Sequence, residues 1–174
     1  SSNTDMDVLT KNNTFIDNEI NATGWAVYDI SDAYFEDINK FIDTKIGNVT
    51  ASFYGFNYSL KSTQQPAPIL TGYAGLNKFL QITNQTPTAN ISINFSYADS
   101  DWQSANIRSE ETLRMWVYRN DVWDKTPQPN TVDKLNNNVF SEITSFSVFG
   151  PLGEVNVDVL VFNCSDLTTP WVTY

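Results

Sequence analysis

The chain has 174 residues, and its 20 acidic and 10 basic residues give a net charge of −10. Nucleic acids and anionic membranes both attract positive charge, so we expect neither as a partner. The sequence has no histidine and a single cysteine, Cys164, which excludes a Ser-His-Asp triad, a Cys-His pair, a zinc site with histidine ligands and an internal disulfide. We therefore expect no catalytic residues and no cofactor.

The ends and the hydropathy of the chain bear on its location. No apolar run approaches the roughly 18 residues that span a membrane, so no membrane insertion is expected. The polar start at residues 1–5 does not have the pattern of a signal peptide. We expect an extracellular or cell-surface protein whose signal peptide has already been removed.

The N-terminal quarter predicts one strand and one helix. Residues 1–24 are polar, and residues 25–30 have the pattern of a strand. Ser31 or Asp32 is a suitable N-cap for a short amphipathic helix over about 32–43. Its apolar side chains recur at helical spacing, a pattern that is typical of packing on a core. They are Tyr34, Phe35, Ile38, Phe41 and Ile42.

From residue 47 onward the pattern is that of β-structure. The predicted strands are 48–60, 69–73, 77–83, 89–97, 112–119, 138–149 and 154–163. Turn signals separate most of them, at 65–68, 84–87, 126–130 and 150–153. Short strands at this spacing favour a sandwich or a barrel.

The expected fold class is therefore mainly β. We expect an immunoglobulin-like β-sandwich with one short amphipathic helix, at about 32–43, and an extra C-terminal strand. Residues 1–150 are predicted to form a single sandwich domain with an N-terminal extension. Residues 151–174 are predicted to be a C-terminal strand or tail that is available for donation to a neighbouring subunit.

The strand at 90–97 has the clearest alternation in the chain. It places Ile91, Ile93, Phe95 and Tyr97 on one face, and we expect them to share one core with Phe146 and Val148. The opposite face carries Asn90, Ser92, Asn94 and Ser96 and is predicted to be wet. In the strand at 48–60 the inward parity changes, and a β-bulge at Gly55 would reconcile the two halves.

Asparagine followed two positions later by serine or threonine is frequent in this chain. The composition predicts about four such triplets by chance, whereas eight are present, none with proline in the middle. This enrichment favours an exported protein that carries covalent N-glycans, and the alternative is an asparagine-rich surface with accidental triplets. The candidate sites are Asn12, Asn21, Asn48, Asn57, Asn84, Asn90, Asn94 and Asn163.

The stretch from about 47 to 150 resembles the archaeal cell-surface β-sandwich domain of the PGF-pre-PGF type. The resemblance rests on the order of several elements: the proline-rich turn at 65–68, the strand ending at 79–82, the alternating strand at 91–97, the aromatic strand at 111–119 and the Phe-Ser-x-Phe segment at 146–149. It implies an extracellular address and a structural or interaction role, and no chemistry. The first 46 residues and the segment 154–163 lie outside it.

Few groups in the sequence are suited to chemistry. Asp99 and Asp101, with Glu110 and Glu111 nearby, are weak calcium candidates, and a solvated acidic loop is the alternative. We expect Cys164 to be a small buried hydrophobe rather than a nucleophile. An isopeptide bond from Lys40 or Lys78 to an Asn or Asp side chain is a minor alternative.

The tryptophans divide into two groups. We expect Trp116 to be packed within the sandwich, because it shares its strand with Met115 and Val117. Trp102 and Trp171 are better candidates for exposed or intersubunit contacts.

These observations predict a structural subunit of an extracellular archaeal surface assembly, such as a filament, a sheath or an S-layer-associated coat. Its partners are copies of itself, joined by β-strand contacts, and the second candidate for a donated strand is 6–10. The alternatives are a strand that folds back on its own sheet and a monomeric adhesion or carbohydrate-binding module. The predicted assembly strand comprises Val155, Val157, Val159, Leu160, Val161 and Phe162.

Overall fold

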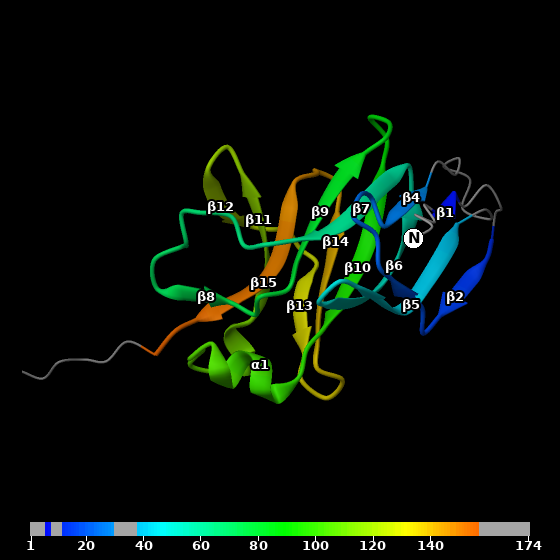
Figure 1. Ribbon diagram of the computed structural model, residues 1–174. Coiled ribbons are helices and arrows are strands. Elements are labelled where there is room, and N and C mark those ends of the chain that lie inside the picture. The colour runs from blue at the N-terminus through cyan, green and yellow to red at the C-terminus, as the bar shows by residue number, and fades with distance from the viewer. Residues whose placement is uncertain (1–5, 8–11, 30–37, 157–174) are drawn as a thin grey trace, which may run out of the picture.

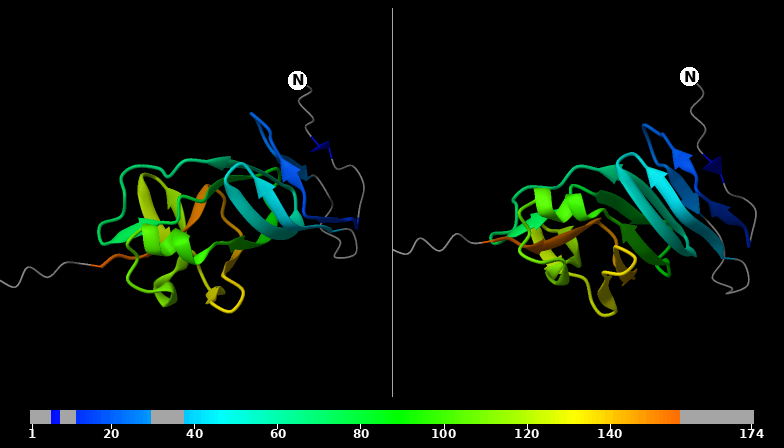
Figure 2. Two further views of the ribbon diagram at one scale, coloured as in Figure 1. Left: turned by 60° about the horizontal axis from the view of Figure 1, so that its bottom comes forward. Right: turned by 90° about the horizontal axis from the view of Figure 1, so that it is seen from below.

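The computed structural model describes residues 6–7, 12–29 and 38–156. Two β-sheets pack face to face (Figures 1 and 2). The main hydrophobic core lies between them. The mainly β fold class and the sandwich are therefore confirmed.

Each sheet combines strands that are far apart in the sequence. Sheet A has the order β1-β4-β7-β9-β15-β11-β12, with β8 also paired to β15. Its strands are β1 (Met6–Asp7), β4 (Val27–Asp29), β7 (Tyr58–Thr63), β8 (Tyr73–Gly75), β9 (Phe79–Asn84), β11 (Arg114–Arg119), β12 (Val122–Lys125) and β15 (Val148–Glu154).

Sheet B has the order β13-β14-β10-β6-β5-β2, with β3 also paired to β5. Its strands are β2 (Thr14–Ile16), β3 (Glu19–Ile20), β5 (Asn39–Ile46), β6 (Val49–Phe56), β10 (Asn90–Ser96), β13 (Asn130–Asp133) and β14 (Asn138–Ile143).

The inward face predicted for the strand at 90–97 is confirmed, whereas its opposite face is not wet throughout, because Ser92 is only 8% exposed. Ile91, Ile93 and Phe95 of β10 are fully buried in the main core, and Tyr97 follows them at 7% exposure. Phe146 packs against the same core. Val148 does not, because it packs against a second cluster, built on Phe79, Trp116, Trp123 and Leu152.

The helix predicted over about 32–43 is wrong wherever the chain is described. Residues 39–46 form β5, a central strand of sheet B, while 30–37 lie outside the described residues. Phe41 is buried in the core, whereas Ile42 is 36% exposed on the outer face of sheet B, where Ile38 also lies. Apolar side chains on both faces of one strand therefore produced the spacing of a helical stripe. The described helices are α1 (Asp99–Ser104) and a single 3₁₀ turn at Glu110–Thr112.

The β-bulge predicted at Gly55 is also wrong. Gly55 lies within β6 in continuous register with Ile91 of β10. The parity changes two residues later, at Asn57, which has a positive φ of 58° and stands between β6 of sheet B and β7 of sheet A. The chain changes sheets there, so the inward side of each half is set by a different sheet.

The turn predicted at 150–153 is a strand instead. β15 runs through this stretch and pairs with β11 on one side and with β9 and β8 on the other. Leu152 is fully buried, and side chains of Phe79 and Ile107 approach the backbone of Gly150 and Gly153 closely. The glycines and the proline therefore serve close packing in the middle of sheet A. The sandwich continues at least to Glu154.

Candidate functional site

The eight candidate N-glycosylation asparagines occupy different environments. Four are exposed, namely Asn12, Asn21, Asn48 and Asn84. Asn90 and Asn94 are half-buried on the outer face of sheet B, as their parity predicts. Asn57 is only 8% exposed, and Asn163 lies outside the described residues. A glycan needs an accessible side-chain nitrogen, so Asn57 is the site least suited to one in the folded protein.

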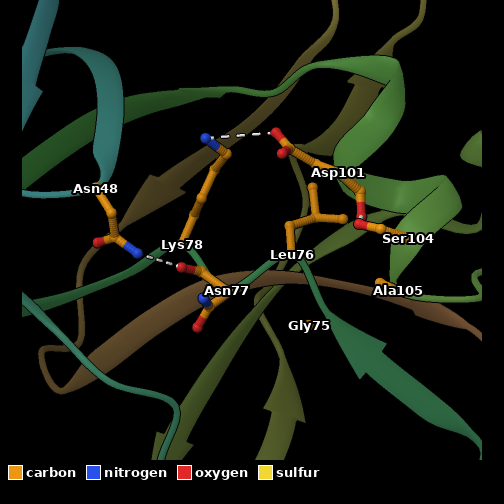
Figure 3. A pocket seen from close by; sticks show the side chains of 8 residues that line it. All are labelled: Asn48, Gly75, Leu76, Asn77, Lys78, Asp101, Ser104 and Ala105. Carbon is orange, nitrogen blue, oxygen red and sulfur yellow. Dashed lines mark hydrogen bonds and ion pairs between the residues drawn. The ribbon is translucent and has the colours of Figure 1, made fainter.

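A polar pocket lies beside the start of β9 and one face of α1 (Figure 3). Lys78 Nζ and Asp101 Oδ2 face each other across it at 3.4 Å, and both side chains are largely shielded from solvent. On the lysine side, Asn48 Nδ2 donates to the main-chain oxygen of Asn77 at 2.5 Å. The pocket has a volume of about 440 Å³. Lys78 and Asp101 pair with each other, and no second carboxylate is among the residues that line the pocket.

The acidic residues that the sequence offers as candidate calcium ligands each have a separate partner within the protein. Asp99 Oδ1 accepts a hydrogen bond from Asn137 Nδ2 at 3.2 Å, and Asp101 pairs with Lys78. Glu111 Oε1 lies 2.5 Å from Lys134 Nζ, and this contact lowers the pKa of Glu111. In the part of the chain that the structure describes, no three His, Cys, Asp or Glu side chains gather closely enough to hold a metal ion.

Glu110 belongs to the same acidic stretch and accepts a hydrogen bond from a tyrosine. The hydroxyl of Tyr97 donates to Glu110 Oε1 at 2.6 Å. Burial first, and then this hydrogen bond and the charge of Glu110, raise the pKa of Tyr97 far above its usual value. The pair therefore keeps Tyr97 protonated and ties the end of β10 to the 3₁₀ turn, which is a structural role.

The outer face of sheet B carries a groove that the sequence analysis did not single out. We name it the outer groove, and its volume is about 510 Å³. Its wall includes Tyr54, which is 46% exposed, and Ile42, which is 36% exposed. The side chains that define it are Lys40, Ile42, Ser52, Tyr54, Ser92, Asn94 and Phe140.

A smaller hollow of about 260 Å³ continues the outer groove. The two share Tyr54 and Ser92, and the smaller one adds Asn90, Phe56 and Glu142. The outward parity of Tyr54 follows from the inward parity of Val49, Ala51 and Phe53, so a sequence signal for this residue existed. The residues that neighbour Tyr54 on adjacent strands could not be predicted in this way, because they depend on strand order and register.

The tryptophans fall partly as expected. Trp116 is 6% exposed and packs with Trp123, Phe79 and Leu152, which confirms its packed role. Trp102 is half-buried against the main core, and its indole nitrogen is buried with no hydrogen-bond partner among the described residues. It is therefore not an exposed tryptophan, and its intersubunit role stays a prediction. Trp171 lies outside the described residues.

The predicted assembly strand is described only at its start. Glu154 ends β15, and Val155 makes an isolated antiparallel bridge to Ile107. Val157, Val159, Leu160, Val161 and Phe162 lie outside the described residues, as does Cys164. Strand donation therefore stays a prediction.

The fold defines the class of the protein as a two-sheet β-sandwich with a grooved outer face on sheet B. Across the described ranges, no helix is both long and apolar enough to cross a membrane. No protein-family model, curated protein or solved structure matches the chain. The resemblance to the PGF-pre-PGF domain thus stays a prediction.

Proposed function

We propose that the protein is a glycosylated structural subunit of an extracellular archaeal surface assembly, held together by β-strand contacts between copies. The proposal includes no catalytic activity. Its archaeal and cell-surface parts rest on the resemblance at 47–150 and on the enriched glycosylation triplets. The assembly part rests on the placement of the two ends of the described chain.

The ends of the described chain lie at opposite ends of the sandwich, and this observation carries the proposal. β1 and β2 lie at one end in both figures, while the last residues of β15 lie beside β8 at the other (Figures 1 and 2). A segment that follows Asn156 in one copy therefore starts far from the N-terminal strands of its own sandwich. If such a segment contacts the N-terminal end of the next copy, the contact is head-to-tail. Head-to-tail contacts build an open filament, unless the rotation between copies closes them into a ring.

The N-terminal strands support strand addition at that end. The pairs β1–β4, β2–β5 and β3–β5 are parallel, whereas every other strand pair in the described ranges is antiparallel. These three strands have only two or three residues each. Each of these short strands pairs through its main chain with a longer or more central strand. A donated strand would make the same kind of main-chain contact.

Two deletions test the proposal. We expect removal of residues 157–174 to abolish assembly, because it removes most of the predicted assembly strand and leaves every described core residue in place. Removal of residues 1–12 is expected to weaken assembly less, since the segment it contains is shorter. Each variant is purified as folded protein, confirmed by circular dichroism, and imaged by negative-stain electron microscopy beside the full chain. If both deleted proteins assemble as the full chain does, strand donation is wrong.

The alternative is a monomeric adhesion or carbohydrate-binding module, and the outer groove favours it. An exposed aromatic ring flanked by amide and hydroxyl groups suits the mixed apolar and polar surface of a sugar. A free neutral oligosaccharide that binds the unglycosylated protein at the outer groove would support this alternative over assembly.

A further inference from the structure

We propose that the outer groove seats the first saccharide units of an N-glycan attached to Asn94. The inference rests on the proposed glycosylation and assigns that glycan a fixed position on the protein. With the glycan in this position, the outer face of sheet B consists of both protein side chains and saccharide units.

Asn94 lies in the middle of the outer groove. It is opposite Phe140 of β14 on one side and opposite Ser52 of β6 on the other. Tyr54 is two residues beyond Ser52 on the same face, so it is a diagonal neighbour of Asn94. Diagonal neighbours in a sheet lie about 7–8 Å apart, within reach of a long side chain. A saccharide attached to Asn94 therefore begins between the rings of Phe140 and Tyr54.

The lining suits a neutral sugar. Lys40 is the one charged side chain among the lining residues of the outer groove, in a chain whose net charge is −10. Aromatic rings accept the apolar face of a pyranose, and the nearby hydroxyls and amides can exchange hydrogen bonds with its polar rim. In addition, Oδ1 of Asn94 is buried and has no hydrogen-bond donor among the described residues.

The glycan of the same chain is a better occupant than a free saccharide. Its attachment point is Asn94 itself, within the triplet Asn94-Phe95-Ser96, and Phe95 fixes the strand because its side chain is fully buried. A tethered ligand reaches the groove at a high effective concentration without the entropic cost of association. Even weak stacking on Tyr54 is then enough to hold it.

The test measures the chemical accessibility of Tyr54 with and without the glycan. The full chain is produced in a host that attaches N-glycans, and hydroxyl-radical labelling is quantified per residue by peptide mass spectrometry. The Ser96→Ala variant removes the acceptor triplet and leaves Asn94 in place. Tyr28 of β4, at 38% exposure, is an internal control in sheet A whose exposure is close to that of Tyr54. The Asn84→Gln variant removes a glycan from an exposed site outside the outer groove.

We expect the glycosylated full chain to carry sugar on Asn94 and to label about fivefold less at Tyr54 than Ser96→Ala, the population ratio that about 1 kcal/mol of stacking gives. Tyr28 should label equally in both proteins, and Asn84→Gln should retain the protection of Tyr54. The full chain made in a host without glycosylation should behave as Ser96→Ala does.

Four results would overturn the inference. If Asn94 carries sugar and Tyr54 labels as strongly as in Ser96→Ala, at about the level of Tyr28, the glycan does not occupy the outer groove, while the proposed function stands. If Tyr54 labels far less than Tyr28 in both proteins, another occupant covers the outer groove. If Asn94 is bare while other triplets carry sugar, only this inference fails. If every triplet is bare, the glycosylated subunit of the proposed function fails as well.

Discussion

At the scale of single residues, Tyr58 is the least expected side chain of the core. It is fully buried at the start of β7, and its hydroxyl has no hydrogen-bond partner among the described residues. Burial, and then the charge of Asp29 on the neighbouring strand, raise the pKa of Tyr58 well above its usual value of 10.0. A buried hydroxyl without a partner costs free energy that a phenyl ring of the same shape does not.

We therefore predict that Tyr58→Phe stabilises the protein by about 1 kcal/mol, measured as the free energy of unfolding in urea at neutral pH. The ring keeps its contact with Phe53 in this variant, since the edge-to-face geometry involves the aromatic carbons. A destabilisation of similar size would mean that the hydroxyl of Tyr58 does have a partner.

The same residue predicts a pH dependence. The pKa of Tyr58 is higher in the folded than in the unfolded chain, so the folded state holds the proton more tightly. Its contribution is fully present below the unfolded pKa and is lost as pH rises towards the folded one. We expect the unfolding free energy of the wild type to fall between about pH 9 and about pH 11, and that of Tyr58→Phe to fall less. If the unfolding free energies of the two proteins fell equally with rising pH, the burial of the Tyr58 side chain would be contradicted.

At the scale of elements, β6 and β10 show why a glycine is required within a strand. A Cβ on Gly55 would meet the main-chain oxygen of Asn90 and would lie 2.8 Å from Cα of Ile91. Both obstacles belong to the backbone of the paired strand, so neither can rotate away. The glycine therefore sets the separation of the two strands behind the outer groove.

We predict that Gly55→Ala destabilises the protein by about 1–3 kcal/mol, the usual cost of overpacking. Gly24→Ala is the matched control, because a Cβ at Gly24 meets no atom within 4 Å. Thermal and urea unfolding of the two variants should separate them clearly. Equal stability of the two would show that β6 and β10 can move apart at no cost.

How well each element could be predicted depended on whether its pattern is local. The alternation in β10 is local and strict, so its inward residues could be predicted, whereas the burial of Ser92 on the opposite face depends on the neighbouring strands. In β5, Phe41 is apolar on the inner face and Ile42 is apolar on the outer face, so the strand resembled a helix. In β15, Gly150 and Gly153 resemble a turn, and only the packing of Phe79 and Ile107 explains them as part of a strand.

At the scale of the whole molecule, the sandwich could be predicted while the outer groove could not. Strand spacing and turn signals indicate two packed sheets without any knowledge of strand order. The outer groove depends on β14, β10, β6 and β5 lying side by side, so that Phe140, Asn94 and Tyr54 meet on one face. That order is a property of the folded chain, and no single segment of the sequence contains it.

Head-to-tail assembly of copies of this chain can be tested by sedimentation velocity of the full chain, produced with its glycans and measured over a range of concentrations. Because β1 and β2 lie at one end of the sandwich and the last residues of β15 lie at the other, we expect a broad distribution of species that grows with concentration well beyond a dimer. A single species with the mass of one glycosylated chain at every concentration would contradict head-to-tail assembly.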